Sequence, residues 1–181
     1  MGADIYLESV SRKCEAKHRS AFDAAVAERD RFREDANKAA ESGDETLAAR
    51  LTAKADKLQE RVDIAFDALQ SEGYFRDSYN RSSLLWLLGL SWWGDVMERL
   101  DENGHLPVES AKWFLAELEK REVPSVDGVR SVFEADSLFS DWENEDRTPD
   151  EWRDYFVEKR DKLIALVKQS IELDEPLLCS V

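Results

Sequence analysis

The residue types best suited to binding a ligand gather in residues 73–93, GYFRDSYNRSSLLWLLGLSWW. They combine a cation, hydrogen-bonding side chains and several aromatic rings, a mixture that is typical of pockets for a planar or anionic molecule. Two more such residues lie on one face of the expected first strand and join the set if that strand packs nearby. The candidate ligand-binding residues are Asp4, Tyr6, Tyr74, Arg76, Asp77, Tyr79, Asn80 and Trp86.

A purely structural role explains the same stretch equally well. Arg76 and Asp77 precede a tryptophan-rich segment, so partial burial is expected, and a buried charge needs a partner. A network of Arg76, Asp77 and Asn80 that caps the following helix would meet that need. Trp86, Trp92 and Trp93 stand at helical spacing among leucines, which indicates a packed core. Both interpretations stay open.

The acidic tract at residues 134–154, EADSLFSDWENEDRTPDEWRD, is the second candidate, with nine acidic residues against two arginines. It lacks the DxDxDG spacing of a calcium loop. One interpretation is a solvated loop, and the other is a patch that binds a basic protein through aromatic anchors ringed by charge. The candidate partner-binding residues are Phe139, Trp142, Glu143, Glu145, Asp146 and Trp152.

The net charge of −15 narrows the classes of partner. A nucleic-acid binder needs clustered Lys and Arg, and an anionic membrane repels an acidic surface. We therefore expect no nucleic-acid partner and no membrane partner. The excess of acidic residues serves solubility, or it forms a surface that binds a basic protein, or it mimics DNA.

Motifs for catalysis and metal binding are missing from the sequence. His18 and His105 stand in no HExxH spacing, and no GxGxxG, GxxxxGK[ST] or GxSxG motif occurs. We therefore predict no catalytic residue, no metal site and no cofactor. Cys14 and Cys179 form no CxxC pair, so reduced thiols and a cytoplasmic location are expected.

The elements that must position these candidates are mainly helical. Residues 3–10 suggest a short strand, and residues 15–42 and 44–71 show apolar residues at 3–4 spacing, separated by SGD at 42–44. Two such helices joined by a tight turn form an antiparallel hairpin, whose stripe depends on alanine. We predict a single domain in which residues 15–72 form a hairpin inserted between the first strand and a helical body, residues 73–181. Such a hairpin can also self-associate into a homo-oligomer.

The body is expected to hold three helical segments. Residues 82–100 are apolar around the whole helix, which predicts one buried helix or a pair bent at Gly89 or Gly94. A helix follows at 106–122, then an irregular acidic stretch at 123–147. Thr148, Pro149 and Glu151 signal the start of a helix that ends before Pro176. The last residues, PLLCSV, can form a strand that pairs with the first, which gives a mainly α fold with a small two-stranded sheet.

Three pieces of the chain, MGADIYL, GYFRDSYNRSSLLWLLGLSWW and EPLLCSV, resemble an uncharacterised family of phage and bacterial proteins. Its members open with Met-Gly-x-Asp-x-Tyr/His-Leu and carry a later Gly-Tyr-Phe/Trp-Arg motif. The resemblance implies a phage or mobile-element context, and so a host cytoplasm, but it implies no activity.

The functional expectation is a non-enzymatic acidic interaction protein that inhibits a host protein, such as a defence protein, by binding its basic surface. The alternative is a protein that sequesters a small nucleotide-like ligand at the Arg76 aromatic region. An enzyme with an unrecognised site is the third candidate.

Overall fold

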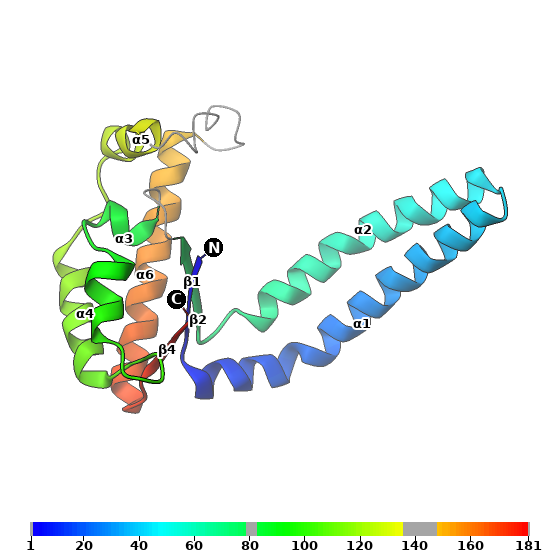
Figure 1. The fold of residues 1–181 in the computed structure, drawn as a ribbon. Helices are drawn as coiled ribbons and strands as arrows, with labels where there is room; N and C mark the ends of the chain where they lie inside the picture. The colour runs from blue at the N-terminus through cyan, green and yellow to red at the C-terminus, as the bar shows by residue number, and fades with distance from the viewer. Residues whose placement is uncertain (1, 79–82, 136–147, 181) are drawn as a thin grey trace. The chain divides into compact units, whose positions relative to one another are not determined.

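The computed structural model of the 181-residue chain describes residues 2–78, 83–135 and 148–180 (Figure 1). These residues form two compact units. The hairpin unit is residues 9–73, and the body is residues 1–8 together with 74–181.

The hairpin unit consists of two long consecutive helices, α1 (Glu8–Glu41) and α2 (Glu45–Leu69), as predicted. Gly43 has φ 80°, a left-handed conformation that suits the turn, and Asp44 caps α2 by accepting a hydrogen bond from the Leu47 amide at 2.9 Å. α1 begins at Glu8, seven residues before the expected start. The polar run SRKCEA at 11–16 hid this first part of the helix, since it shows little apolar periodicity.

Small side chains make up most of the interior of the hairpin. The buried residues of the two helices are Cys14, Ala25, Ala36, Ala39, Ala55, Val62 and Leu69. Polar side chains join the helices between them, and Arg29 donates from Nη1 to Gln59 Oε1 at 3.0 Å. The two helices therefore meet through a thin apolar seam, as the alanine-rich stripe predicted.

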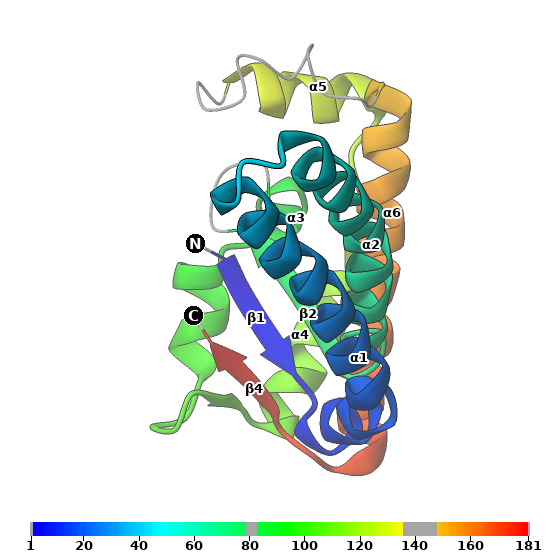
Figure 2. The ribbon, with the colours of Figure 1, turned by 90° about the vertical axis from the view of Figure 1, so that its right-hand side faces the viewer.

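The body contains a four-stranded antiparallel sheet in the order β2-β1-β4-β3. The strands are β1 (Gly2–Tyr6), β2 (Tyr74–Ser78), β3 (His105–Leu106) and β4 (Leu177–Ser180). The pairing of the first and last segments is confirmed, and Figure 2 shows β1 and β4 side by side. The two-stranded prediction missed β2 and β3, because both are short and β2 places an aspartate at an inward position.

Helices cover one face of this sheet, on which Ala3, Ile5, Phe75 and Cys179 are buried (Figure 1). They are α3 (Leu84–Leu87), α4 (Val108–Lys120) and α6 (Pro149–Leu173). Thr148 and Glu151 form the predicted capping box at the start of α6. A further helix, α5 (Val126–Ala135), corrects the expectation that residues 123–147 are irregular throughout. Its apolar residues Val126, Val129 and Val132 are spaced as on a helix, but the surrounding acids concealed them.

The segment expected to be one buried helix, or a pair bent at Gly89 or Gly94, is broken into three short pieces. The four residues of α3 end at a turn in which Gly89 has φ 69°, and a π-helical turn η1 (Trp92–Val96) and a 3₁₀ turn η2 (Met97–Arg99) follow. Trp92 is 2% exposed, as a core residue should be, but Trp86 is 48% and Trp93 is 59% exposed. Of the two interpretations, core packing therefore fits Trp92 and does not fit Trp86 or Trp93.

Within the described residues, no helix is both long and apolar enough to cross a membrane. Cys14 and Cys179 are both free thiols and both buried.

Candidate functional site

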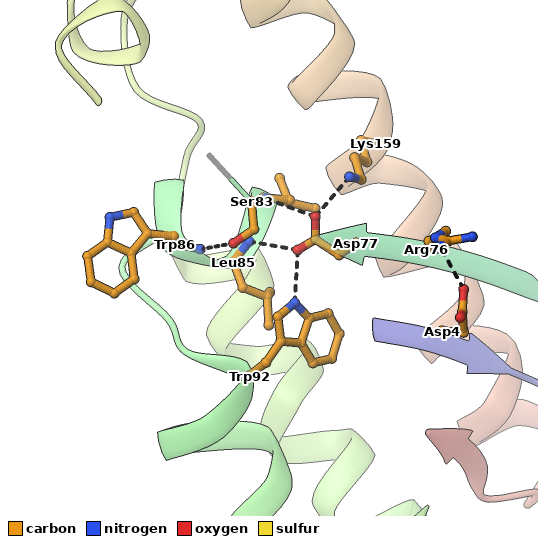
Figure 3. A network of polar contacts seen from close by, with 9 residues as sticks. Asp4, Arg76, Asp77, Ser83, Leu85, Trp86, Trp92 and Lys159 are labelled. Atoms are coloured by element: carbon orange, nitrogen blue, oxygen red, sulfur yellow. Dashed lines mark hydrogen bonds and ion pairs between the residues drawn. The ribbon is translucent and has the colours of Figure 1, made fainter. Parts of the chain in front are cut away.

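Asp77 is the centre of the body's polar contacts. It lies at an inward position of β2 and is 2% exposed. Its carboxylate accepts hydrogen bonds from the amides of Leu84 at 3.0 Å and Leu85 at 3.2 Å, and from Trp92 Nε1 at 3.0 Å (Figure 3). These three donors come from α3 and η1, so one side chain connects β2 to both elements.

Lys159 supplies the charge that balances Asp77. Its Nζ lies 2.8 Å from Asp77 Oδ1, and its side chain is 14% exposed on α6. The ammonium group also lies 5.8 Å from the Phe75 ring centre and 5.6 Å from that of Tyr155, distances at which a cation is attracted to an aromatic face. The pair is therefore held from β2 and α6 at once, with aromatic rings around the cation.

Ser83 completes the start of α3. Its Oγ accepts a hydrogen bond from the Trp86 amide at 3.2 Å. Together, Ser83 and Asp77 satisfy the first amides of a helix that has only four residues. We call Asp77, Ser83, Trp92 and Lys159 the Asp77 network. This network caps α3 and links β2 to η1 and α6.

The predicted capping network is confirmed for Asp77 and wrong for Arg76. Asp77 does cap the following helix, but Arg76 points to the other face of the sheet, since neighbouring residues of a strand alternate. Asn80 lies outside the described residues. Sequence reasoning missed Lys159, which lies 82 positions from Asp77, so no local pattern joins the two.

A second cluster lies on the opposite face of the sheet. Asp4 stands opposite Arg76, and Tyr6 stands opposite Tyr74, in the pairing of β1 with β2. Tyr74 Oη donates to Asp4 Oδ1 at 2.6 Å, and the two tyrosine rings are 5.0 Å apart. Arg76 Nε is 3.7 Å from the same carboxylate oxygen, and its side chain is 64% exposed. The structure thus brings together Asp4, Tyr6, Tyr74 and Arg76, which we call the Tyr–Arg cluster.

Both tyrosines of this cluster are poor acids. Burial raises the pKa of Tyr74, and its hydrogen bond to the negative Asp4 raises it further. Burial also raises the pKa of Tyr6, with a smaller contribution from Asp4 that Arg76 opposes. Neither phenol is available as a base near neutral pH, so the cluster offers stacking faces and one exposed guanidinium group, the properties of a binding surface.

The remaining candidates are dispersed. Trp86 lies on α3 with its ring directed away from Asp77 (Figure 3). Trp152 lies in the first turn of α6, where its ring stacks on Phe156 at 6.0 Å and meets the edge of Tyr155 at 5.6 Å. Of the predicted site residues, Tyr79, Asn80, Phe139, Trp142, Glu143, Glu145 and Asp146 lie outside the described residues.

We looked in the described residues for metal ligands and for reactive side chains. No group of three or more His, Cys, Asp or Glu residues there is placed to hold a metal ion. Burial raises the pKa of the Cys179 thiol to about 12, so this thiol stays protonated and unreactive near neutral pH. The buried Asp77 has its oxygens occupied by structural donors.

Comparison of the chain with protein-family models, with curated proteins and with solved structures gives no significant match. No relative therefore supplies a role for the Asp77 network or for the Tyr–Arg cluster. Their geometry and the distribution of charge in the chain are the basis on which a function can be proposed.

Proposed function

We propose that the chain is a non-enzymatic interaction protein whose acidic body binds a basic surface of a partner protein. The distribution of charge between the two units carries this proposal. Residues 1–8 and 74–181 hold 26 acidic and 13 basic residues, a net charge of −13, whereas residues 9–73 hold 14 acidic and 12 basic residues, a net charge of −2. A surplus that served solubility alone would need no such concentration in one unit.

A concentrated negative potential attracts a basic partner and speeds its association, more strongly at low salt. Residues 134–154, with nine acidic residues against two arginines, contribute about half of the body's net charge. Among the described residues, Glu98, Asp101, Glu102 and Glu109 add exposed carboxylates. The resemblance to phage proteins makes a host protein the partner we expect, with inhibition of that protein as the consequence.

Charge reversal in matched sets tests the proposal. One variant carries Glu143→Lys, Glu145→Lys and Asp146→Lys in the acidic tract, and its control carries Glu41→Lys, Asp56→Lys and Glu60→Lys at exposed hairpin positions. Both sets change the net charge equally. In-cell cross-linking followed by mass spectrometry should identify a partner with a basic surface, which the tract variant loses and the hairpin variant retains.

Two results would contradict the proposal. Equal loss of the partner in both variants would show that total charge, and not the body, governs the contact. A partner without a basic surface, or capture that does not weaken as salt rises, would show that the contact is not electrostatic.

The Tyr–Arg cluster supports a second candidate function, the binding of a small nucleotide-like ligand. The observation that favours it is the exposed Arg76 guanidinium group beside the rings of Tyr6 and Tyr74, which fits a planar group that carries negative charge. Native mass spectrometry of the protein purified from its host should then show an adduct that its denatured mass lacks.

Arg76→Ala separates this second function from a structural role. The exposed side chain makes a long contact with Asp4, so the variant should lose the adduct and keep its stability to within about 0.5 kcal/mol. A large loss of stability with no adduct in the parent protein would instead assign Arg76 to the fold.

A further inference from the structure

We infer that the Tyr–Arg cluster binds a nucleoside monophosphate, with its base on Tyr6 and its phosphate on Arg76, and that Gly2 is the positioning residue of Arg76. The inference rests on the second candidate function, the binding of a small nucleotide-like ligand. It adds the class of the ligand, the way in which the ligand lies on the sheet, and a residue whose missing side chain decides where the guanidinium group lies.

The pairing of the strands arranges the cluster in two neighbouring rows on one face of the sheet. In the first row, Tyr6 of β1 stands between Tyr74 of β2 and Leu178 of β4, and all three residues are partly exposed. In the second row, Asp4 of β1 stands opposite Arg76 of β2. The first row presents aromatic and apolar surface, and the second row presents charged groups.

The first row suits the flat face of a nucleobase. The ring centres of Tyr6 and Tyr74 are 5.0 Å apart, and the hydrogen bond from Tyr74 Oη to Asp4 Oδ1 at 2.6 Å holds the second ring in place. Leu178 adds apolar surface on the other side of Tyr6. Every nucleobase has an aromatic face that stacks on such a ring, so the row can bind a base without reading its identity.

Gly2 makes room for the guanidinium group of Arg76. A Cβ atom at position 2 would lie 3.2 Å from Arg76 Nε and 3.6 Å from Nη2, so the guanidinium group occupies the space that another residue would fill. The same Cβ atom would lie 2.7 Å from the backbone oxygen of Asp77, which is too close for a side chain. Gly2 is one row beyond Asp4, on the side away from Tyr6. The guanidinium group therefore leans away from the aromatic row.

The separation of the aromatic row from the guanidinium group selects the class of ligand. Residues of neighbouring rows are two positions apart along a strand, which is about 7 Å, and the lean of Arg76 toward Gly2 adds to this distance. A molecule whose negative charge is attached directly to its ring is too short to reach both. In a nucleoside monophosphate the sugar separates the phosphate from the base, so that each can meet its own row.

The charge of the body favours one phosphate over three. The body has a net charge of −13, so each further phosphate of a ligand adds repulsion. One guanidinium group forms its two parallel hydrogen bonds with a single phosphate. Arg76 is 64% exposed and can make that contact. A monophosphate should therefore bind more tightly than the corresponding triphosphate.

The test titrates the full chain with the four common nucleoside 5′-monophosphates, followed by calorimetry and by nuclear magnetic resonance. At least one monophosphate should bind, should shift the signals of Tyr6, Tyr74 and Leu178, and should leave the indole N–H signal of the buried Trp92 unchanged. The corresponding nucleoside, inorganic phosphate and the corresponding triphosphate should each bind at least fivefold more weakly.

Two substitutions separate the contact with the base from the contact with the phosphate. Tyr6→Leu should weaken binding of the monophosphate and of the nucleoside alike, by about tenfold, as expected when one stacking partner is lost. Arg76→Lys keeps the positive charge but loses the two parallel hydrogen bonds. It should weaken binding of the monophosphate about three- to tenfold and leave that of the nucleoside unchanged.

The positioning role of Gly2 needs a readout other than stability. Gly2→Ala should remove most of the preference for the monophosphate over the nucleoside, but should have no further effect in a chain that carries Arg76→Ala. Gly94→Ala is the matched control, since a Cβ atom there would meet its nearest neighbour at an ordinary 3.8 Å, and it should keep the preference. If Gly2→Ala does not fold, Arg76→Lys decides the case.

The outcomes separate the inference from the functions proposed above. If a short planar anion such as benzoate shifts the cluster's signals and no monophosphate does, the inference is wrong and the second candidate function stands. If no anion shifts them, both are wrong, and the proposal of a basic protein partner is unaffected. A further loss of affinity from Gly2→Ala beside Arg76→Ala would show that position 2 acts through the sheet and not through Arg76.

Discussion

At the scale of single residues, the body tolerates the buried carboxylate of Asp77 because hydrogen-bond donors surround it. Taking an unpaired charge out of water costs several kcal/mol, but Asp77 meets three N–H donors and an ammonium group. The same contacts join β2, α3, η1 and α6, so their value lies as much in fixing the arrangement of elements as in stability.

Removal of either member of this ion pair should account for much of the loss caused by removal of both. Asp77→Ala leaves the Lys159 ammonium group buried without its counter-charge, and we expect a loss of about 3–5 kcal/mol in the free energy of unfolding. Lys159→Met should cost a similar amount. The double variant should lose clearly less than the sum of the two, as measured by urea denaturation, and strict additivity would show that the two side chains do not interact.

The raised pKa of Tyr74 predicts that the folded protein loses stability in alkaline solution. Its pKa is raised in the folded chain above its ordinary value of 10.0. Above pH 10 the unfolded phenol therefore releases its proton while the folded one retains it, so stability present below pH 10 falls as the pH rises further. Tyr74→Phe removes this dependence. Thermal denaturation of both proteins between pH 8 and 11 should show curves that converge at high pH, and parallel curves would contradict the prediction.

At the scale of elements, the hairpin depends on side chains that allow two helices to approach closely. Ala25, Ala36 and Ala39 of α1 and Ala55 of α2 are buried, and a larger side chain at a closely packed position must displace its neighbours. The seam therefore tolerates little change in volume.

Two alanines of α2 provide a matched test of this seam. Ala55 is fully buried and Ala53 is exposed. Ala55→Leu should destabilise the hairpin by about 1–3 kcal/mol through overpacking, whereas Ala53→Leu should be nearly neutral. Thermal unfolding followed by circular dichroism at 222 nm measures both. An equal response would place the contact between the helices elsewhere.

The sequence predicted those elements whose characteristic residues lie close together along the chain. The SGD turn, the capping box at Thr148 and the alanine stripe each depend on residues within a few positions of one another. The segment after Ser83 was mispredicted because its order comes from distant donors and acceptors. Leucines and tryptophans predict burial from composition, yet only the indole of Trp92, among the tryptophans at 86, 92 and 93, is buried, and it bonds to Asp77. For the candidate site, the sequence found Asp4, Tyr6, Tyr74 and Arg76 but could not show that Asp77 faces away from them.

At the scale of the whole molecule, the hairpin is an insertion between two strands that are neighbours in the sheet. Tyr6 stands opposite Tyr74 in the antiparallel pairing of β1 and β2, so the two ends of the insertion are already close together. The contacts that hold the sheet and the Asp77 network all come from the body.

The body should therefore fold without the hairpin. A chain in which residues 8–72 are replaced by Asn-Gly would join β1 to β2 through a short turn of the kind that antiparallel strands favour. We expect dispersed nuclear magnetic resonance signals and cooperative unfolding from this shortened protein. A disordered product would show that the hairpin unit is needed for the body to fold.

The position of β4 in the interior of the sheet has a consequence for the order of events during synthesis. Ile5 of β1 pairs with Cys179 of β4, so this contact spans nearly the whole sequence. The ribosome exposes residues 9–73 long before residues 177–180, and the hairpin's contacts are close in sequence, so this unit can form while the body is still being made. Until β4 arrives, β1 is an unpaired edge on the side that β4 later fills. A nascent chain is therefore most exposed to aggregation and to chaperones in that interval.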